Sequence, residues 1–464
     1  MNLQGLRAAA QDSPIRLNVA GAQDARGPGV APASLLIETG EGGDRLRLMA
    51  IGTPGEIDRD ARSGRARVVE MPRTVILPGM VNAHTHLDLT HIGPREHDAG
   101  AGFMPWVEMI RAVRAADEAE TVASVARGIE LSRSAGVVAV GDIAGAPRST
   151  PGRASLAAWR TMREKGMAGV SFLEFFAIGA GRERYLQWLP RILEEAEQEG
   201  ALAVNAGSGH GARIGLQPHA PNTVCLDAYR WARSEAKRRS LPLSTHLAES
   251  PEERRFIGEG TGPMRELLER LGLWDDSILA ETGGGLSPVA HLAPVLAGSG
   301  AIVAHVNNAS DADVELLARS GCTVAYCPRA SEYFGAVERF GPHRYRDMIA
   351  AGINVALGTD SIVNLPVLPP TAARTPAEGG SGMSILDEMR LLWRRDGTDA
   401  RTLLAMGTTN GAQALGLADG FVLEAGSVLA GLVGVEIEPG GESEGGEPIE
   451  RVFDSASPAE LLFG

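Results

Sequence analysis

The chain has 464 residues, a hydrophobic fraction of 44%, a charged fraction of 22% and a formal net charge of -14. These fractions are those of a soluble globular protein, and the length exceeds that of one ordinary domain. The negative charge has no basic stripe to offset it, which argues against general nucleic-acid binding.

The cysteines and the apolar segments indicate the cellular compartment in which the protein works. Cys225, Cys322 and Cys327 are an odd number without the spacing of a metal site, which fits a reducing compartment. The first residues contain no apolar core of signal-peptide length, and no stretch is apolar enough to span a bilayer. We expect a cytoplasmic protein without a membrane partner, and we leave open whether it forms a homo-oligomer.

The two ends of the chain, residues 1–73 and 416–464, are predicted to build one small β-sandwich. Both ends contain short apolar runs separated by Gly, Asp and Pro turns, which is typical of antiparallel strands. The runs lie at 33–37, 46–51, 421–423, 427–437 and 451–453. We expect this domain to be a scaffold that carries no chemistry.

The middle of the chain, residues 74–415, alternates strand-like and helix-like segments. After a first strand that leads to residue 84, candidate strands lie at 136–142, 170–176, 213–219, 242–246, 301–305, 322–327 and 354–360. Helical patterns lie between them, at 119–135, 226–239, 262–271 and 311–320. Eight such units indicate an α/β fold, the (β/α)8 TIM barrel, whose active site lies at the C-terminal tips of its strands.

Four polar residues at strand tips suggest a metal site. His84 and His86 are two residues apart on the first strand, so both side chains point to the same side. His246 closes the fifth strand and Asp360 closes the eighth. Three imidazoles and one carboxylate suit zinc or another first-row metal and leave room for a catalytic water. Each residue taken alone has a structural alternative, such as a core histidine or a helix-capping aspartate.

Two further residues could act on that water. Glu249 follows His246 by three residues and could pass a proton from the water to a leaving nitrogen. Its alternative is a solvated glutamate at a helix start. His305, at the tip of the sixth strand, could orient the water or stabilise an oxyanion, with a core histidine as the rival interpretation.

Six motifs together resemble the amidohydrolase superfamily: PGMVNAHTHLDL, PHAPNT, STHLAES, AHVNN, AYCPR and LGTDSIVN. The resemblance covers about residues 70 to 415. It is closest to the branch of aromatic-ring deaminases and chlorohydrolases, which includes adenosine-type and aminodeoxyfutalosine deaminases. By this resemblance His84, His86, His246 and Asp360 bind the metal, with Asp360 also catalytic. Glu249 and His305 would handle protons and water, and His219 would contact the substrate.

The lysines favour a single metal. Binuclear members of the superfamily bridge two metals with a carboxylated lysine on the fourth strand, whereas this strand reads Ile214-Gly-Leu-Gln217-Pro218. Lys165 and Lys237, the two lysines of the chain, are not at strand tips in the predicted fold. We expect one divalent ion, zinc or alternatively iron.

Several other residues are expected to contact the substrate. The segment from Phe103 to Arg111 resembles one in aminodeoxyfutalosine-deaminase-like proteins, so Phe103 and Trp106 could stack on a flat ring, or could pack a helix against its own core. Glu174 could accept hydrogen bonds from the substrate, or be a buried structural carboxylate. Arg329 could hold a carboxylate or phosphate.

Two departures from the pattern concern the substrate. Ser331 stands where related segments commonly carry His or Asn. An insertion at 365–382 follows the eighth strand and is either a flap over the pocket or a loop of no consequence.

Taken together, these features predict hydrolytic deamination of a small molecule, an amino-substituted heteroaromatic ring, by metal-bound hydroxide. The ring would be that of a purine nucleoside or of an aminodeoxyfutalosine-like compound. Hydrolytic dechlorination and cleavage of a cyclic amide or amidine need the same site and are the alternatives. A barrel that has lost catalysis and acts as a binding protein is the alternative from another class.

Overall fold

The computed structural model describes residues 14–40, 46–202, 211–367, 382–417, 419–438 and 446–464. Contacts divide the chain into two compact units. The first comprises Met1–Asn82, Glu130–Ala139 and Leu368–Gly464, and the second comprises Ala83–Ile129 and Val140–Val367.

The barrel consists of eight parallel strands in two runs of four, ordered β5-β6-β7-β8 and β12-β11-β10-β9. They are β5 (Met80–Thr85), β6 (Val137–Ala144), β7 (Ala168–Phe175), β8 (Ala212–Pro218), β9 (Ser244–Leu247), β10 (Ile302–His305), β11 (Thr323–Tyr326) and β12 (Asn354–Leu357). Parallel bridges from Leu216 to Leu243 and from Thr85 to Asp360 join the two runs into a closed ring. The predicted (β/α)8 barrel is confirmed.

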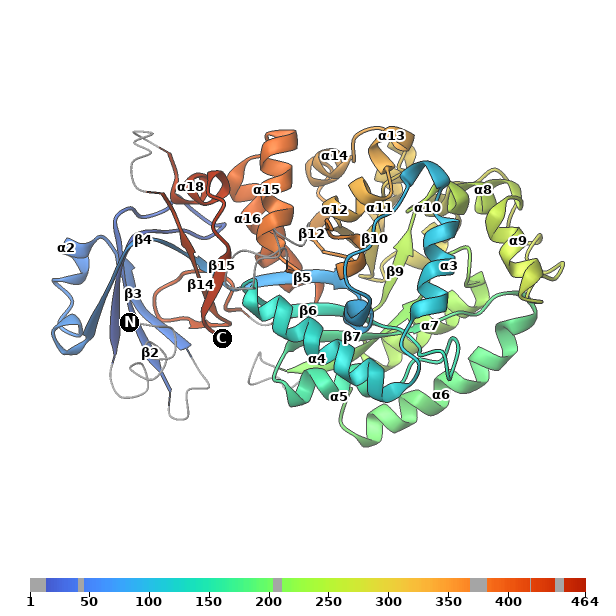
Figure 1. Ribbon diagram of the computed structural model, residues 1–464, viewed down its shortest axis with the longest axis horizontal. Coiled ribbons are helices and arrows are strands. Elements are labelled where there is room, and N and C mark those ends of the chain that lie inside the picture. Colours follow the sequence, from blue (N-terminus) through green and yellow to red (C-terminus); the bar gives the residue numbers. More distant parts are fainter. Residues whose placement is uncertain (1–13, 41–45, 203–210, 368–381, 418, 439–445) are drawn as a thin grey trace. The chain divides into compact units, whose positions relative to one another are not determined.

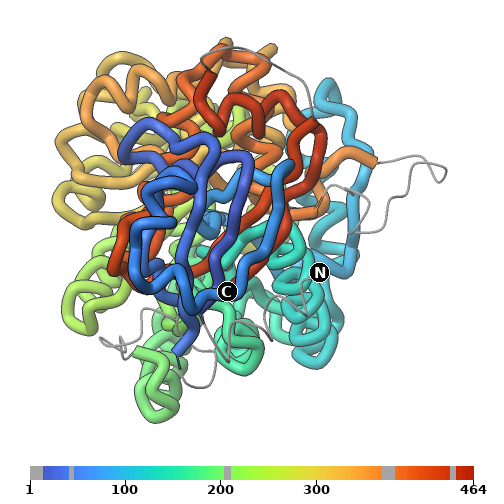
Figure 2. Tube along the Cα trace, turned by 90° about the vertical axis from the view of Figure 1, so that its left-hand side faces the viewer, coloured from blue at the N-terminus to red at the C-terminus, as the bar shows by residue number. Residues whose placement is uncertain are grey.

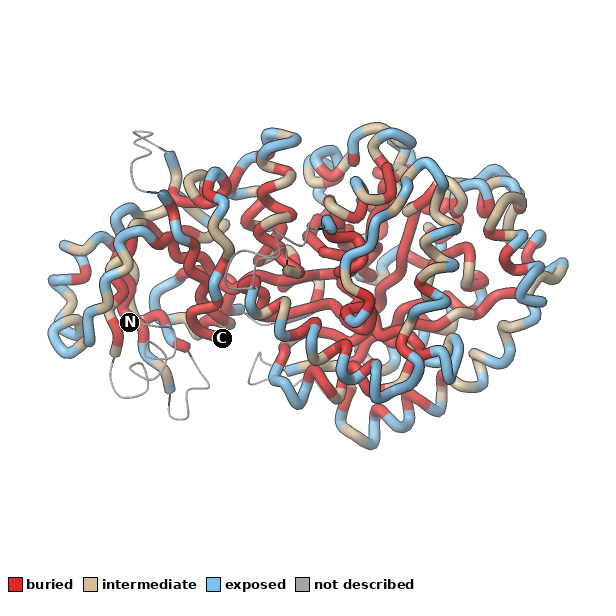
Figure 3. Tube along the Cα trace, in the orientation of Figure 1, coloured by how far each residue is buried: buried red, intermediate tan, exposed pale blue. Residues whose placement is uncertain are grey.

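Burial explains why these segments read as continuous apolar runs. Seven of the eight strands are buried along nearly their whole length, because helices cover the outer face of a parallel barrel while side chains fill its interior. Figure 3 shows these strands as buried and the surrounding helices as exposed on one side.

The helices that follow the barrel strands are short to medium in length (Figure 1). They are α3 (Met104–Val113), α4 (Glu118–Ser134), α5 (Ala157–Glu164), α6 (Arg182–Gln198), α7 (Leu226–Arg239), α8 (Pro251–Glu259), α9 (Pro263–Arg270), α10 (Pro288–Leu296), α11 (Asp311–Ser320), α12 (Pro328–Tyr333), α13 (Ala336–Phe340) and α14 (Tyr345–Ala350). The chain continues with α15 (Ile385–Asp396), α16 (Ala400–Gly407) and α17 (Thr409–Ala414). Among the described helices, none is both long and apolar enough to cross a membrane.

Strands from both ends of the chain form one seven-stranded sheet, ordered β13-β3-β2-β1-β4-β14-β15. They are β1 (Ile15–Ala22), β2 (Ala33–Thr39), β3 (Leu46–Gly52), β4 (Arg67–Pro78), β13 (Val428–Leu429), β14 (Leu432–Glu436) and β15 (Ala459–Phe463). The N-terminal and C-terminal strands lie side by side in Figure 2, and β4 pairs with β14. The small β-sandwich expected from both termini takes the form of this one seven-stranded sheet among the described strands, with an apolar core that includes Leu17, Leu35 and Leu432.

Two predicted strands of this domain are wrong. Residues 451–453 lie in helix α18 (Pro448–Asp454), because Pro448 begins the helix and Glu447 and Glu450 form a capping box around its first turn. Residues 421 and 422 form a bend and residue 423 is irregular, so this segment is not a strand. The actual last strand, β15, was not predicted.

Candidate metal centre and active site

The four predicted metal ligands come together at the C-terminal end of the barrel. His84 lies on β5 and His86 directly follows it, His246 lies on β9, and Asp360 follows β12 by three residues. All four are buried. Backbone hydrogen bonds fix the seam between the first and last strands, since the amide of His86 donates to the carbonyl of Asp360 and the amide of Asp360 donates to the carbonyl of His84.

The spacing of the side-chain atoms fits one tetrahedral ion. The Nε2 atoms of His86 and His246 are 3.3 Å apart, and Oδ1 of Asp360 is 3.6 Å from Nε2 of His84 and 3.5 Å from Nε2 of His86. Two ligand atoms at about 2.0–2.2 Å from a tetrahedral ion lie about 3.3–3.6 Å apart. Both ring nitrogens of His84 are buried without a hydrogen-bond partner among the described residues. These residues could therefore hold a divalent metal.

Neighbouring groups orient two of these side chains. Nδ1 of His246 lies 2.9 Å from the carbonyl oxygen of His219, which can only accept, so Nδ1 carries the proton and Nε2 offers its lone pair. The amide of Asn364 donates to Oδ2 of Asp360 and leaves Oδ1 facing the histidines. Burial lowers the pKa of His84 and of His246 to about 3, so both rings are neutral, as metal ligation requires.

Glu249 and His305 lie next to this cluster. Oε1 of Glu249 is 3.6 Å from Nε2 of His305, and the Glu249 side chain is 13% exposed. Burial, followed by the charge of Asp360, raises the pKa of Glu249 well above its ordinary value. A carboxyl with a raised pKa holds a proton more readily than an ordinary glutamate, which suits a group that carries protons.

The backbone around Glu249 is held on both sides. The amides of Ala248 and Glu249 donate to the two carboxylate oxygens of buried Glu253, at 2.9 and 2.7 Å. The side-chain amide of Asn307 donates to the carbonyl of Glu249 at 3.1 Å, and the hydroxyl of Ser331 donates to Asn307. Ser331 therefore supports the position of Glu249 through Asn307.

The backbone is in the left-handed region at four non-glycine residues near these tips. These are Ala248 (φ 52°), His305 (φ 71°), Val306 (φ 54°) and Asp360 (φ 58°). Such conformations are costly for residues with a Cβ and persist only where surrounding contacts enforce them. Their concentration at the strand tips sets these side chains apart from ordinary core residues.

Glu174 lies on β7 and His219 directly follows the neighbouring strand β8, so the two side chains are close to each other. Nε2 of His219 is 4.0 Å from Oε1 of Glu174, and the ring of His219 stacks on Phe176 with centroids 4.6 Å apart. The Glu174 side chain is 2% exposed. Both side chains are thus placed on the side of the barrel formed by β7 and β8.

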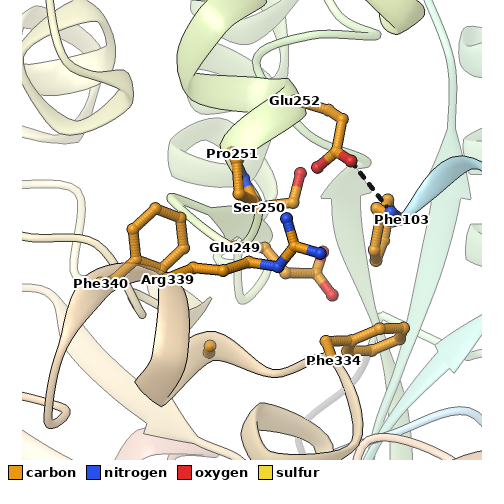
Figure 4. Close-up of a pocket in the computed structure, with 9 residues that line it drawn as sticks. Phe103, Glu249, Ser250, Pro251, Glu252, Phe334, Arg339 and Phe340 are labelled. Atoms are coloured by element: carbon orange, nitrogen blue, oxygen red, sulfur yellow. Dashed lines mark hydrogen bonds between the residues drawn. The ribbon is translucent and has the colours of Figure 1, made fainter. Parts of the chain in front are cut away.

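Phe103 lines a pocket whose wall also includes Glu249, as Figure 4 shows. Its ring contacts those of Trp106 and Phe334, with centroids 5.3 and 5.0 Å away. Phe103 also packs against a buried apolar cluster that includes Phe256. Phe103 therefore packs against the core, and stacking of Phe103 or Trp106 on a substrate ring stays a prediction.

The remaining predicted residues are less informative. Arg329 is half-buried in the first turn of α12, and its role as an anion ligand stays a prediction. Most of the insertion at 365–382 lies outside the described residues, which resume at residue 382.

Three polar residues of the barrel, Asp88, Arg114 and Asp142, were not singled out from the sequence as site residues. Arg114 forms ion pairs with Asp88 and Glu174, and Asp142 is fully buried at the end of β6. The helical period carried the missed signal, because Trp106, Ile110 and Arg114 are four residues apart and share one face of α3, whereas Arg111 is exposed.

Comparison with known proteins places the chain in a family. Residues 75–429, more than half of the chain, match the amidohydrolase family. The chain belongs to the amidohydrolase family. Its members are metal-dependent hydrolases, which agrees with the cluster of His84, His86, His246 and Asp360.

Two relatives and one solved structure indicate which members of the family the chain resembles. The chain is 28% identical over 340 residues to an aminodeoxyfutalosine deaminase of Deinococcus radiodurans, covering 68% of this chain and 70% of the relative. It is 23% identical over 405 residues to a 5-methylthioadenosine/S-adenosylhomocysteine deaminase of Pyrococcus furiosus, covering 81% and 79%. The structure of Helicobacter pylori aminofutalosine deaminase in complex with methylthio-coformycin superposes with a TM-score of 0.73 at 17% identity. It covers 96% of this chain and 98% of that one, and it shows that the two proteins share a fold.

Proposed function

We propose that this amidohydrolase removes the amino group from a heteroaromatic ring, that of a purine nucleoside or of an aminodeoxyfutalosine-like compound, by hydrolysis. One observation carries the proposal: the carboxyl of Glu249 lies beside Nε2 of His305 and next to the cluster of three histidines and Asp360. This arrangement provides a proton carrier at the place where a metal would activate water. The two relatives named above are both deaminases by name, one of aminodeoxyfutalosine and one of 5-methylthioadenosine and S-adenosylhomocysteine, and they support the choice of reaction.

We infer one ion per chain, zinc or alternatively iron, held by His84, His86, His246 and Asp360. Three imidazoles and a carboxylate suit these metals, and β8 offers Gln217 where a bridging lysine would have to stand. When bound, such an ion lowers the pKa of a water molecule toward neutrality and so supplies a nucleophile.

The protein side chains would move the protons. As water adds to the ring carbon that bears the amino group, Glu249 takes the proton of the water and gives it to the adjacent ring nitrogen. His305 donates a hydrogen bond to the oxygen that has been added. Glu249 then takes the remaining hydroxyl proton and passes it to the amino group, the carbon–nitrogen bond breaks, and ammonia leaves.

The substrate ring would lie against the residues from β7 and β8 and from the segment before α3. His219 and Glu174 would contact its edge, and Phe103 or Trp106 its face. Arg329 would contact an acidic substituent.

A panel of compounds tests the reaction. Purified protein would be incubated with adenosine-type nucleosides, aminodeoxyfutalosine, cytosine, guanine and chlorinated triazines, and ammonia and chloride would be measured. We expect ammonia from one of the adenine-type compounds. Chloride release, or turnover of a cyclic amide alone, would contradict deamination and support the corresponding alternative.

A further inference from the structure

Arg114 is a largely buried cation in the second compact unit, which holds most of the barrel and is called the barrel unit below. It caps the C-terminal end of α3, and its side chain is 15% exposed. Its Nη2 lies 3.1 Å from Oδ2 of Asp88, and its Nη1 lies 3.5 Å from Oε2 of Glu174. The side chains of Asp88 and Glu174 are 3% and 2% exposed, so both ion pairs are shielded from water.

The guanidinium is well suited to bridge these carboxylates. Its planar fork can direct one nitrogen to each acid, whereas a lysine would offer a single point charge. Burial alone would lower the pKa of Arg114, but Asp88 and Glu174 raise it, so the cation persists. Removal of one member of such a group leaves an uncompensated buried charge, which is strongly unfavourable.

The bridge fixes the orientation of Glu174. Arg114 engages Oε2, and the other oxygen, Oε1, faces Nε2 of His219 at 4.0 Å. We propose that Arg114 is a positioning residue that aims Oε1 of Glu174 at the part of the pocket beside His219, and that this part receives neutral hydrogen-bond donors of the substrate. The proposal rests on the proposed function, because it concerns the same substrate pocket.

The charges explain why the ligand group would be a neutral donor. Both terminal nitrogens of Arg114 already face carboxylates, so the cation is compensated and would not attract a substrate anion. Two carboxylates face this one cation, and Oδ1 of Asp88 is buried without a hydrogen-bond partner among the described residues, as is Nε of Arg114. Hydroxyl or N–H groups of the substrate would supply the missing donors.

Gly145 allows Arg114 to occupy this position. A Cβ at Gly145 would lie 2.0 Å from Nη2 of Arg114 and 2.6 Å from Oδ2 of Asp88. The backbone of Gly145 is outside the left-handed region, so alanine is acceptable to the backbone itself. Gly145→Ala should therefore displace the guanidinium, together with the carboxylate of Asp88, without replacing any charged residue.

The experiment compares Arg114→Met, Arg114→Lys and Gly145→Ala, with Arg230→Met and Gly284→Ala as matched controls. Arg230 forms an exposed ion pair, and a Cβ at Gly284 meets nothing within 4 Å. We expect KM to rise about 10–100-fold in Arg114→Met and in Gly145→Ala, the effect of one lost hydrogen bond to a charged group, with kcat much less affected. Arg114→Lys should recover part of the loss, and both controls should behave as wild type.

A double variant separates positioning from a general structural role. In a Glu174→Gln background, Arg114→Met should have little further effect on KM, because both changes remove the same contact. Equal effects of Arg114→Met in the two backgrounds, or an unchanged KM in the single variants, would overturn the proposal.

Failure of the proposed function would be visible separately. If wild-type protein released ammonia from no compound of the panel, the reaction would be wrong, and crystal structures would still test the positioning. A Glu174 side chain that rotates away from His219 in Arg114→Met and Gly145→Ala would support it. An unchanged Glu174 in both variants would contradict it.

Discussion

At the scale of single residues, the site combines fixed backbones with side chains that face inward. Glu253 and Asn307 hold the backbone of Glu249, and its carboxyl is left near His305. A proton carrier needs this combination, because it must reach two positions on the substrate without leaving the site. The roles of these residues remain predictions that single substitutions can test.

Glu249→Gln should retain the metal and lose most of its turnover. Glutamine has nearly the same shape but cannot accept and release a proton, and general acid–base catalysis is worth roughly 10²–10⁴-fold. Ammonia release and metal content would be measured together. Glu259→Gln, on the exposed face of α8, is the control and should be fully active. A Glu249→Gln enzyme with a near-normal rate would mean that another group, such as His305, carries the proton.

Asp142 should make stability depend on pH. Burial, followed by the charge of Asp88, raises the pKa of Asp142 to about 8. The unfolded chain loses this proton near a pH of about 4. The protonated Asp142 therefore stabilises the fold fully below a pH of about 4, and this stabilisation is lost as the pH rises through about 8.

Asp142→Asn removes this titration. The side-chain oxygen of asparagine can still accept from the Leu87 amide, and its nitrogen can donate to the Ser171 hydroxyl, which donates to Oδ2 of Asp142 in the wild-type protein. Urea unfolding at about pH 5 and about pH 9 would compare the free energies of unfolding. Relative to wild type, the variant should gain stability toward high pH by a few kcal/mol, on the order of 1.4 kcal/mol per pKa unit. If the free energies of unfolding of wild type and Asp142→Asn changed with pH in the same way, Asp142 would not be protonated in the folded protein.

Sequence reasoning found residues whose position follows from a strand and missed those that depend on tertiary packing. His84, His86, His246 and Asp360 could be predicted because each closes an apolar run, and parallel strands end at the same side of a barrel. Arg114 reaches the site from a helix end, and Asp142 pairs with groups distant in sequence. Their partners could not be read from the local pattern.

At the scale of elements, backbone hydrogen bonds and close packing constrain the seam between β5 and β12. It closes the ring through the bridge between Thr85 and Asp360, and both adjoining strands supply candidate metal ligands. Gly358 lies in this seam, where a Cβ would be 2.7 Å from the carbonyl oxygen of His84 and 2.9 Å from Sγ of Cys327. A methyl group this close to the carbonyl oxygen of His84 would force the backbone to shift.

Gly358→Ala should therefore weaken metal binding and destabilise the fold by about 1–3 kcal/mol, the usual cost of overpacking. Chelator competition would measure the metal affinity, and urea titration the free energy of unfolding. Gly258→Ala, whose Cβ would have its nearest contact at 3.5 Å from the carbonyl of Leu286, serves as the control. Unchanged metal affinity in Gly358→Ala would show that the seam is not rigid.

The elements themselves were predictable to different degrees. The barrel strands stand out because burial on both faces gives uninterrupted apolar runs. Residues 451–453 were assigned wrongly because this short segment, with two apolar residues, has no period. Glu447 and Pro448 are the capping signals that indicate a helix. A short apolar run can be assigned to a strand or to a helix only with the help of the residues that flank it.

At the scale of the whole molecule, the chain supplies a catalytic barrel and a sheet from both termini. The domain boundaries at 73 and 415 and the oligomeric state stay predictions. The site lies within the barrel unit, since residues 84–360 contain every candidate ligand and proton carrier. Function should therefore depend on the metal bound there.

Titration of the metal-free protein with zinc, followed by ammonia release, tests the central claim most directly. The metal would be removed with a chelator, and the initial rate on the best nucleoside of the panel would be measured after each addition. The account predicts no activity without metal, and a rate that rises linearly and levels off at one ion per chain. A rate that levels off at two ions per chain, or full activity in the metal-free protein, would contradict a single-metal deaminase.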